Sequence, residues 1–292
     1  MNTRRDGVRT LVRTASIEVS DIEDADLRHK YQRLEEILAG FENVLLAFSA
    51  GVDSTFLLQS ALKVKGRDNV LAVTADSPIR SREKLQASRR LTEKMDVEHR
   101  VIETAELEND DFASNEPDRC YHCKHILYGK LLEIAAENDI GSVLDGTNAD
   151  DLEGAHRPGY DVLEELDIRA PLEEAGLKKK EIRKLSRLAG LPTWDQPSDT
   201  CYATRVDYEL ELDKDLIDKV REMEKIIAES GEFEQLRARI HDDNTVRIEV
   251  LPKNMNKIMD LRPEIAAAAR EMGFTYVTLD LQGYRQGSIN EK

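Results

Sequence analysis

Three groups of residues in this chain have the types and spacing that chemistry requires. The first is the stretch FSAGVDST, where small residues stand beside the carboxylate of Asp53 and hydroxyl side chains. Small residues let backbone N–H groups approach a ligand closely, and a helix that follows the loop adds partial positive charge at its N-terminus. The loop therefore predicts a phosphate-binding site, formed by Ser49, Ala50, Gly51, Val52, Asp53 and Ser54.

Two familiar phosphate-binding motifs do not occur in this stretch. No lysine follows Gly51 as it would in the Gly-x-x-x-x-Gly-Lys-Ser/Thr loop, and the dinucleotide fingerprint Gly-x-Gly-x-x-Gly is missing as well. The alternative is an ordinary strand-to-helix turn in which Asp53 or Ser54 only caps the helix. The flanking pattern favours a phosphate site, because an apolar strand, the loop and an apolar helix follow in that order.

The second group consists of three cysteines, Cys120 and Cys123 in RCYHCK and Cys201 in PSDTCYATR. An odd number argues against a disulfide framework. The close pair could be a redox dithiol, and the three thiolates with His122 or His125 could bind zinc. Three thiolates without a fixed fourth ligand also suit a [4Fe–4S] cluster with one open iron, and cysteines can simply pack in a core. The residues alone leave these alternatives open.

A third stretch, DGTNADD, carries polar residues at the end of an expected strand. Gly146 would permit close approach of a ligand, and Asn148, Asp150 or Asp151 could contact a nucleotide or a metal. The alternative is a solvated acidic turn.

The elements that must position these residues follow an alternating pattern of strand and helix. Such alternation predicts the α/β class, a doubly wound and mostly parallel sheet that binds ligands at the carboxyl ends of its strands. The phosphate loop lies at such an end. The expected strands are Val44–Phe48, Val70–Ala75, Val97–Ile102 and Ser142–Asp145, and the expected helices are Leu27–Leu38, Glu83–Met95, Ile126–Glu137 and a helix from Lys178 that stops at Gly190.

The last third of the chain shows a different pattern, which predicts a smaller α+β domain. We therefore expect a mobile N-terminal arm over residues 1–26, a nucleotide-binding domain over 27–207 and a domain for substrate binding or oligomerisation over 208–292. The elements expected in this domain are helices at Lys214–Glu229 and Met255–Met272, and strands at Leu236–Ile240, Val246–Val250 and Tyr276–Leu281.

Composition limits the classes of partner. Hydrophobic residues make up 40% and charged residues 34% of the chain, no apolar run is long enough to cross a bilayer, and no signal peptide is visible. We therefore expect a cytoplasmic protein without a membrane partner. The net charge of −16 argues against nucleic acid, because binding to a phosphate backbone depends on lysine and arginine.

At the level of whole motifs, the chain resembles a known family. FSAGVDS is similar to the Ser-Gly-Gly-x-Asp-Ser loop of the PP-loop ATP pyrophosphatases, with Ala50 in place of the first glycine. From about residue 27 onward the chain resembles the LarE family of ATP-dependent sulfur transferases, which are PP-loop proteins. The segments that carry this resemblance are PDRCYHCKHILYGKL, LDGTNADD, HRPG, PLEEAGLKKKEIRKLSRLAGLPTWDQPSDTCYATR, LRARI, VRIEV and GFTYVTLDLQGYRQGSINE.

The resemblance implies an activity. A carboxylate of pyridinium-3,5-biscarboxylic acid mononucleotide is adenylated by ATP, and sulfur then displaces AMP to give a thiocarboxylate for the nickel-pincer cofactor of lactate racemase. It also implies that Asp53, with Asp151, orients Mg²⁺ and the phosphates. Cys201 matches the sulfur-donating cysteine, which one subgroup sacrifices. The other subgroup has the extra Cys-x-x-Cys, so the resemblance implies a [4Fe–4S] cluster on Cys120, Cys123 and Cys201.

The substrate's carboxylates and phosphate require local cations. Arginines suit both groups, and the resemblance adds an acidic residue on the preceding helix. For each arginine the alternative is a surface ion pair. The expected substrate-binding residues are Arg205, Glu224, Arg237 and Arg239. The other partners implied are a sulfide source and further copies of the chain in a homo-oligomer.

Three other functions compete with this interpretation. A PP-loop tRNA thiolase would need an extended basic surface, which the acidic composition does not favour. An amide-forming ligase, similar to an NAD or GMP synthetase, would share the phosphate loop without needing the cysteines. A non-enzymatic nucleotide-binding or iron–sulfur regulatory protein would bind ATP without releasing pyrophosphate.

Overall fold

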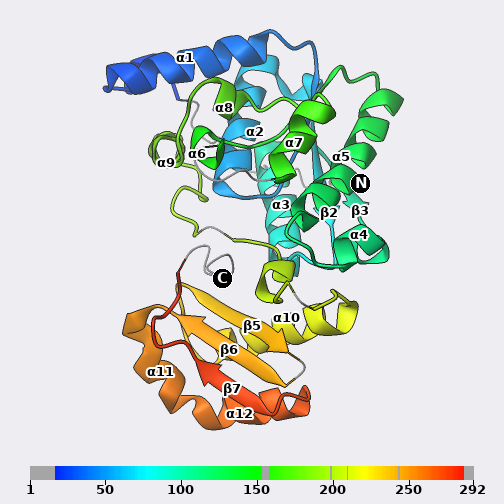
Figure 1. Ribbon diagram of the computed structural model, residues 1–292. Coiled ribbons are helices and arrows are strands. Elements are labelled where there is room, and N and C mark those ends of the chain that lie inside the picture. Colours follow the sequence, from blue (N-terminus) through cyan, green and yellow to red (C-terminus); the bar gives the residue numbers. More distant parts are fainter. Residues whose placement is uncertain (1–16, 153–157, 198, 209, 243, 286–292) are drawn as a thin grey trace, which may run out of the picture.

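The computed structural model describes residues 17–152, 158–197, 199–208, 210–242 and 244–285. Figure 1 shows a larger packing unit around a parallel sheet and a smaller one around a second sheet, drawn at the bottom of the view. The predicted α/β class with an additional small sheet is confirmed. None of the helices in these ranges is both long and apolar enough to span a membrane.

The larger unit contains a four-stranded sheet in the order β3-β2-β1-β4. All three pairings are parallel, as the alternating sequence pattern predicted. The two central strands are almost completely buried, because helices cover both faces of the sheet. The strands are β1 (Val44–Ala47), β2 (Val70–Asp76), β3 (Glu98–Glu103) and β4 (Ser142–Leu144).

Nine helices are described in this unit, and α5 differs most from its prediction. It begins at Arg119 and not at Ile126, so the Cys-x-x-Cys motif occupies its first two turns. The helices are α1 (Ala25–Ala39), α2 (Val52–Lys65), α3 (Arg82–Met95), α4 (Asp110–Ala113), α5 (Arg119–Glu137), α6 (Ala149–Leu152), α7 (Pro158–Glu165), α8 (Pro171–Glu174) and α9 (Lys179–Leu188). Short 3₁₀ turns are η1 (Val19–Asp21), η2 (Arg67–Asn69), η3 (Glu106–Glu108) and η4 (Tyr202–Arg205).

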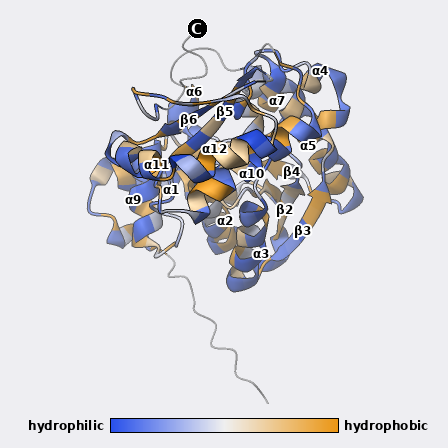
Figure 2. Ribbon diagram, turned by 90° about the horizontal axis from the view of Figure 1, so that it is seen from below, coloured by the Kyte–Doolittle hydropathy of each residue, from blue (hydrophilic) through white to orange (hydrophobic). Residues whose placement is uncertain are grey.

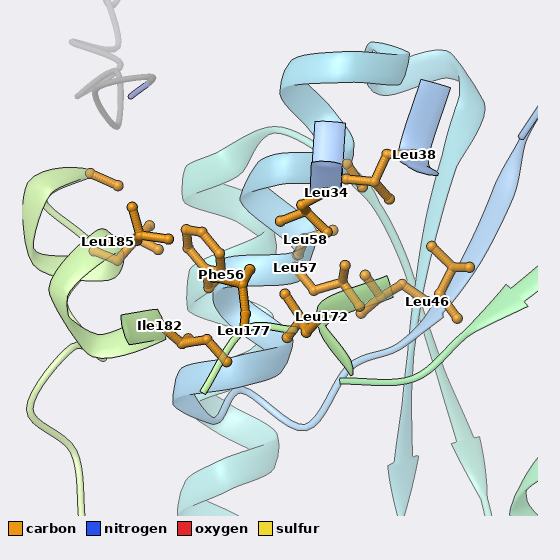
Figure 3. Packing of buried hydrophobic residues seen from close by; sticks show 14 of the residues in the cluster. Leu34, Leu38, Leu46, Phe56, Leu57, Leu58, Leu172, Leu177, Ile182 and Leu185 are labelled. Atoms are coloured by element: carbon orange, nitrogen blue, oxygen red, sulfur yellow. The ribbon is translucent and has the colours of Figure 1, made fainter. Parts of the chain in front are cut away.

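One apolar cluster joins α2 to the helices around it. Phe56 and Leu57 of α2 are buried, and α9 packs against them through Ile182 and Leu185 (Figure 3). Leu34 and Leu38 of α1 lie on the same cluster (Figure 3). Since α2 and α9 share this core, the starts of these two helices are held close together.

The smaller unit has a three-stranded sheet in the order β5-β6-β7, with β5–β6 antiparallel and β6–β7 parallel. Figure 2 shows hydrophobic and hydrophilic residues mixed along α12. The buried apolar residues of α10 and α12 form one cluster with those of β5 and β6, so these two helices pack on the sheet. The elements are α10 (Lys214–Glu229), β5 (Leu236–Asp242), β6 (Thr245–Val250), the 3₁₀ turn η5 (Pro252–Asn254), α11 (Met255–Asp260), α12 (Arg262–Glu271) and β7 (Tyr276–Leu279).

Besides the start of α5, three further boundaries differ from the sequence predictions. The helix expected over Met255–Met272 is split at Leu261, because Pro263 lacks the N–H that would continue the first helix. Ile17 and Ile22 are buried against the larger unit, so the N-terminal arm predicted over 1–26 is too long; its residues 1–16 lie outside the described part. Val206 pairs with Ile240 and belongs to the second core, so this core begins before residue 208.

Candidate active site

A cleft of about 430 Å³ opens at the carboxyl ends of the parallel strands. The segments that line it follow β1, β2 and β4, and they meet there because all these strands point the same way. The start of α5, the start of α9 and the connector before the second unit complete the wall. The phosphate-loop residues in this lining are Ser49, Gly51, Val52, Asp53 and Ser54, and the cysteines are Cys123 and Cys201.

The predicted phosphate loop is folded tightly at the start of α2. Gly51 is the N-cap residue, and the hydroxyls of Ser49 and Ser54 lie 3.0 Å apart. Ala50 is fully buried and adopts a left-handed φ of 54°, a conformation that glycine adopts more easily. A Cβ on Gly146 would lie 3.1 Å from the Ser54 nitrogen, so the glycine permits close approach of the helix start.

Asp53 stands in the first turn of α2 and faces a cation from another helix. The ammonium of Lys179 donates to Asp53 Oδ2, while Oδ1 is buried without a hydrogen-bond partner among the described residues. Burial raises the pKa of the Asp53 carboxyl, Lys179 acts in the opposite direction, and the neighbouring Asp151 raises the pKa further. Two carboxylates and one ammonium therefore meet at this end of the cleft.

The DGTNADD stretch holds its side chains mainly through contacts with one another. Asn148 is 2% exposed, and its amide donates to Asp151 Oδ2 at 2.7 Å. Its carbonyl oxygen accepts from the Asp150 nitrogen at 3.0 Å. Asp151 lines the cleft, but Asn148 does not. The Asn148 side chain therefore fixes Asp151 in this structure, and a contact between Asn148 and a nucleotide stays a prediction.

Asp145 is the first residue after β4, and several donors surround it. Tyr128 donates to Asp145 Oδ2 at 2.7 Å, and the Thr147 nitrogen donates to Oδ1 at 2.8 Å. Burial by itself would raise the pKa of Asp145, but Lys124, Thr147 and Tyr128 outweigh it and lower the pKa below its usual value. Asp145 therefore contributes a fixed negative charge to the cleft wall.

The three cysteines lie near one another but differ in exposure. Cys123 and Cys201 are partly buried, and both pack on the core of the smaller unit. Cys120 is exposed one turn before Cys123 on α5, beside Gly159, where an added Cβ would lie 3.3 Å from the Cys120 Cβ. Burial raises the pKa of the Cys123 thiol to about 12; Cys201, Glu106 and Cys120 add to this effect, and Arg80 opposes it. None of the three forms a disulfide.

The donor chemistry of this group fits an iron–sulfur cluster, because the chain supplies three thiols and no fourth cysteine. Cys123 and Cys201 line the cleft from two segments, and Cys120 lies one turn before Cys123 on α5. Within the described ranges, no three histidine, cysteine or acidic side chains already form a metal-binding group. His122 lies 3.5 Å from Asp118 and His125 3.9 Å from Glu165, and neither histidine lines the cleft. The residues that would supply an all-thiolate site are therefore present, but in this structure their side chains do not have the geometry of metal ligands.

The basic side chains that line the cleft were not among the site residues predicted from the sequence. They stand at the start of α3, on α5 and along one face of α9, so the cleft is locally basic although the chain is acidic. One signal was available, because lysines at positions 178–180 begin a helix, where the helix dipole disfavours positive charge. The basic residues in the lining are Arg80, Lys84, Lys124, Lys179 and Arg183.

The four residues expected to bind substrate do not line this cleft. Arg205 pairs with Glu224 at 3.0 Å, and its guanidinium also donates to the Thr200 and Cys201 carbonyls. Arg239 pairs with Glu249 at 2.7 Å and donates to the Thr204 carbonyl at 2.7 Å. Arg237 donates to the Leu236 carbonyl and stacks on Tyr284, and burial lowers its pKa. In this geometry Arg205 and Arg239 fix the segment that carries Cys201.

Comparison with known proteins assigns this chain to a family. The NAD synthase family model matches residues 28–118, which include the phosphate loop. The chain is 34% identical to pyridinium-3,5-bisthiocarboxylic acid mononucleotide synthase of Lactiplantibacillus plantarum, over 91% of this chain and 96% of that protein. It is also 34% identical to an uncharacterised protein of Synechocystis, over 90% of this chain and 98% of that protein. The chain therefore belongs to the LarE family of PP-loop proteins.

Proposed function

We propose that this protein is an ATP-dependent sulfur transferase that converts a carboxylate of pyridinium-3,5-biscarboxylic acid mononucleotide into a thiocarboxylate. One observation carries the proposal: Cys123 and Cys201 line the same cleft as the phosphate loop. An activated acid formed at the loop would therefore lie within reach of sulfur chemistry at the thiols. The name of the Lactiplantibacillus plantarum relative, a bisthiocarboxylic acid mononucleotide synthase, supports this substrate class.

The first step would use the end of the cleft around Asp53. The loop amides and the start of α2 would hold the triphosphate, and the carboxylates of Asp53 and Asp151 are suitable ligands for Mg²⁺. A substrate carboxylate oxygen attacks the α-phosphorus of ATP, and the bond to pyrophosphate breaks. After this step the group that leaves the acyl carbon is AMP, which is a far better leaving group than a carboxylate oxygen. The cations that line the cleft would offset the charge of ATP and of the anionic substrate.

The second step requires sulfur at the acyl carbon. Sulfide attacks this carbon, the carbon–oxygen bond to AMP breaks, and a thiocarboxylate and AMP remain. We propose that Cys120, Cys123 and Cys201 hold a [4Fe–4S] cluster, which when bound supplies exchangeable sulfide at its open iron. Arg205 contributes by fixing the backbone on both sides of the Thr200–Cys201 peptide.

An amide-forming ligase is the second candidate, and the NAD synthase match over residues 28–118 favours it. Such an enzyme would use the same adenylation but would transfer nitrogen and would not need the cysteines. Replacing all three cysteines by serine separates the two functions. A ligase would keep its activity, whereas a sulfur transferase would lose product formation but keep pyrophosphate release.

The decisive experiment is anaerobic reconstitution with iron and sulfide, followed by turnover with ATP and the pyridinium substrate. We expect about four irons per chain, as a [4Fe–4S] cluster requires. We also expect a thiocarboxylate product and an unchanged mass at Cys201. A loss of sulfur from Cys201 would indicate sacrifice of this cysteine, and one tightly held zinc with intact sulfur transfer would refute the cluster.

Asp53→Asn provides the matched test of the nucleotide end. It should abolish pyrophosphate release and leave iron content unchanged, because Asp53 pairs with Lys179 and not with the cysteine segments. Loss of iron in this variant would contradict the division of roles.

A further inference from the structure

The cation that contacts Asp53 belongs to the protein itself. Lys179 is 30% exposed and Asp53 is 18% exposed, so their ion pair lies in the cleft wall, partly shielded from water. Asp151 lies close enough to act electrostatically on Asp53. A single ammonium therefore offsets part of the negative charge of the two carboxylates that are best suited to bind a divalent cation.

The position of Lys179 is fixed from two sides. Its backbone nitrogen donates to Asp150 Oδ2 at 2.8 Å, which holds the first turn of α9. Further along the helix, Ile182 and Leu185 pack on Phe56 of α2, the helix that carries Asp53 (Figure 3). Lys179 also stands at a helix N-terminus, where the dipole disfavours a cation. A charge that the local helix dipole disfavours, held in a well-packed position, is typical of a functional site.

A divalent cation bound to the Asp53 carboxylate would repel the Lys179 ammonium that contacts Oδ2, because like charges at such a distance repel strongly. A metal–nucleotide complex resolves this conflict, since it brings the cation together with phosphate oxygens that can accept from the displaced ammonium. Neither the bare metal nor the bare nucleotide offers both partners.

We propose that Lys179 determines the specificity of the nucleotide site for the metal complex. It neutralises Asp53 in the empty cleft and moves to a phosphate when the metal arrives with the nucleotide. This inference rests on ATP binding in the proposed function, but it does not depend on sulfur transfer.

The test compares binding of Mn²⁺ alone with binding of the Mn²⁺ complex of α,β-methylene-ATP, which cannot be cleaved between its α- and β-phosphates. Both affinities are measured by titration calorimetry. In Lys179→Met we expect Mn²⁺ alone to bind about tenfold more tightly and the complex about tenfold more weakly. Each of these changes in affinity corresponds to the loss of one partly exposed charge interaction of Lys179. Lys179→Arg keeps the positive charge, so its affinities for Mn²⁺ alone and for the complex should stand in the same order as in the wild type.

Lys180→Met is the matched control, because it removes the same charge from the neighbouring, exposed position outside the cleft lining. It should leave both affinities within twofold of wild type, as expected for a solvated charge. Lys179→Gln provides a second neutral variant if the methionine variant does not fold. In an Asp53→Asn background the effect of Lys179→Met on Mn²⁺ affinity should vanish.

A Lys179→Met variant with unchanged Mn²⁺ affinity would overturn the inference. Weakening of both affinities together would also overturn it, because that result indicates a structural role for Lys179. A wild-type protein that binds no metal–nucleotide complex would instead contradict the proposed function.

Discussion

Arg205 and Glu224 form a buried ion pair, with Nε 3.0 Å from Oε1 and only 2% of the arginine side chain exposed. The same guanidinium donates to the carbonyls of Thr200 and Cys201 at 2.6 and 2.9 Å. Glu224 lies on α10 of the smaller unit, and its Oε1 also accepts from the Ala238 nitrogen of β5 at 3.1 Å. The pair therefore ties the Cys201 segment to the second core.

Glu224→Gln should destabilise the protein, because it leaves the buried Arg205 charge without its main counter-ion. We expect a loss of about 3 kcal/mol in the free energy of unfolding, measured by urea denaturation. Lys225→Ala, which breaks the exposed Lys225–Glu222 pair on the same helix, should change the free energy by less than about 0.5 kcal/mol. Equal losses in the two variants would contradict a special role for the buried pair.

Ala50 gives a prediction about the phosphate loop. Ala50→Gly should leave stability within about 1 kcal/mol of wild type, because relief of the left-handed backbone offsets the lost buried methyl and the greater chain entropy. Ala50→Val should destabilise by at least about 2 kcal/mol, since a branched side chain suits neither the backbone nor the packed site. Thermal unfolding of both variants measures the contrast, and a stable Ala50→Val protein would show that the loop can rearrange.

Gly146 and Gly129 form a second contrasting pair. A methyl on Gly146 would press on the backbone of Ser54, so Gly146→Ala should weaken nucleotide binding about tenfold by displacing the loop. Gly129 lies within α5 and has open space around its Cβ position, so Gly129→Ala should stabilise the protein by about 0.5–1 kcal/mol. Calorimetric titration and thermal unfolding test both, and unaltered nucleotide affinity in Gly146→Ala would refute the tight contact.

Tyr128→Phe should alter how stability depends on pH. The variant removes a donor to Asp145 and should cost about 1.5–3 kcal/mol at neutral pH, where the carboxylate is ionised. Since Asp145 has a lowered pKa in the folded protein, this contribution is complete above about pH 4 and disappears as the pH falls through the folded pKa. The difference between the urea midpoints of the two proteins should therefore stay constant from pH 7 to about pH 4 and shrink as the pH is lowered further. A difference that grows as the pH falls would exclude the carboxylate as the cause.

Much of the site followed from local sequence rules. The strand, loop and helix around Asp53 were predicted from an apolar run, a stretch of small residues and a second apolar run. This prediction was possible because hydrophobic periodicity and glycine positions are local signals that span only a few residues. The parallel sheet followed from the alternation of strand and helix, which leaves few other topologies. The helix break before Pro263 was missed because the apolar periodicity runs through it.

The sequence by itself determined which reactive groups exist: the loop carboxylate, the three thiols and the motifs that carry the family resemblance. Only the tertiary structure decided which side chains face one another. Packing of α9 on α2 brings Lys179 to Asp53, and burial against the second core turns Arg205 toward Glu224 and away from the cleft. Such contacts join residues far apart in the chain, and the free energy of burying a charge depends on partners that no local pattern specifies.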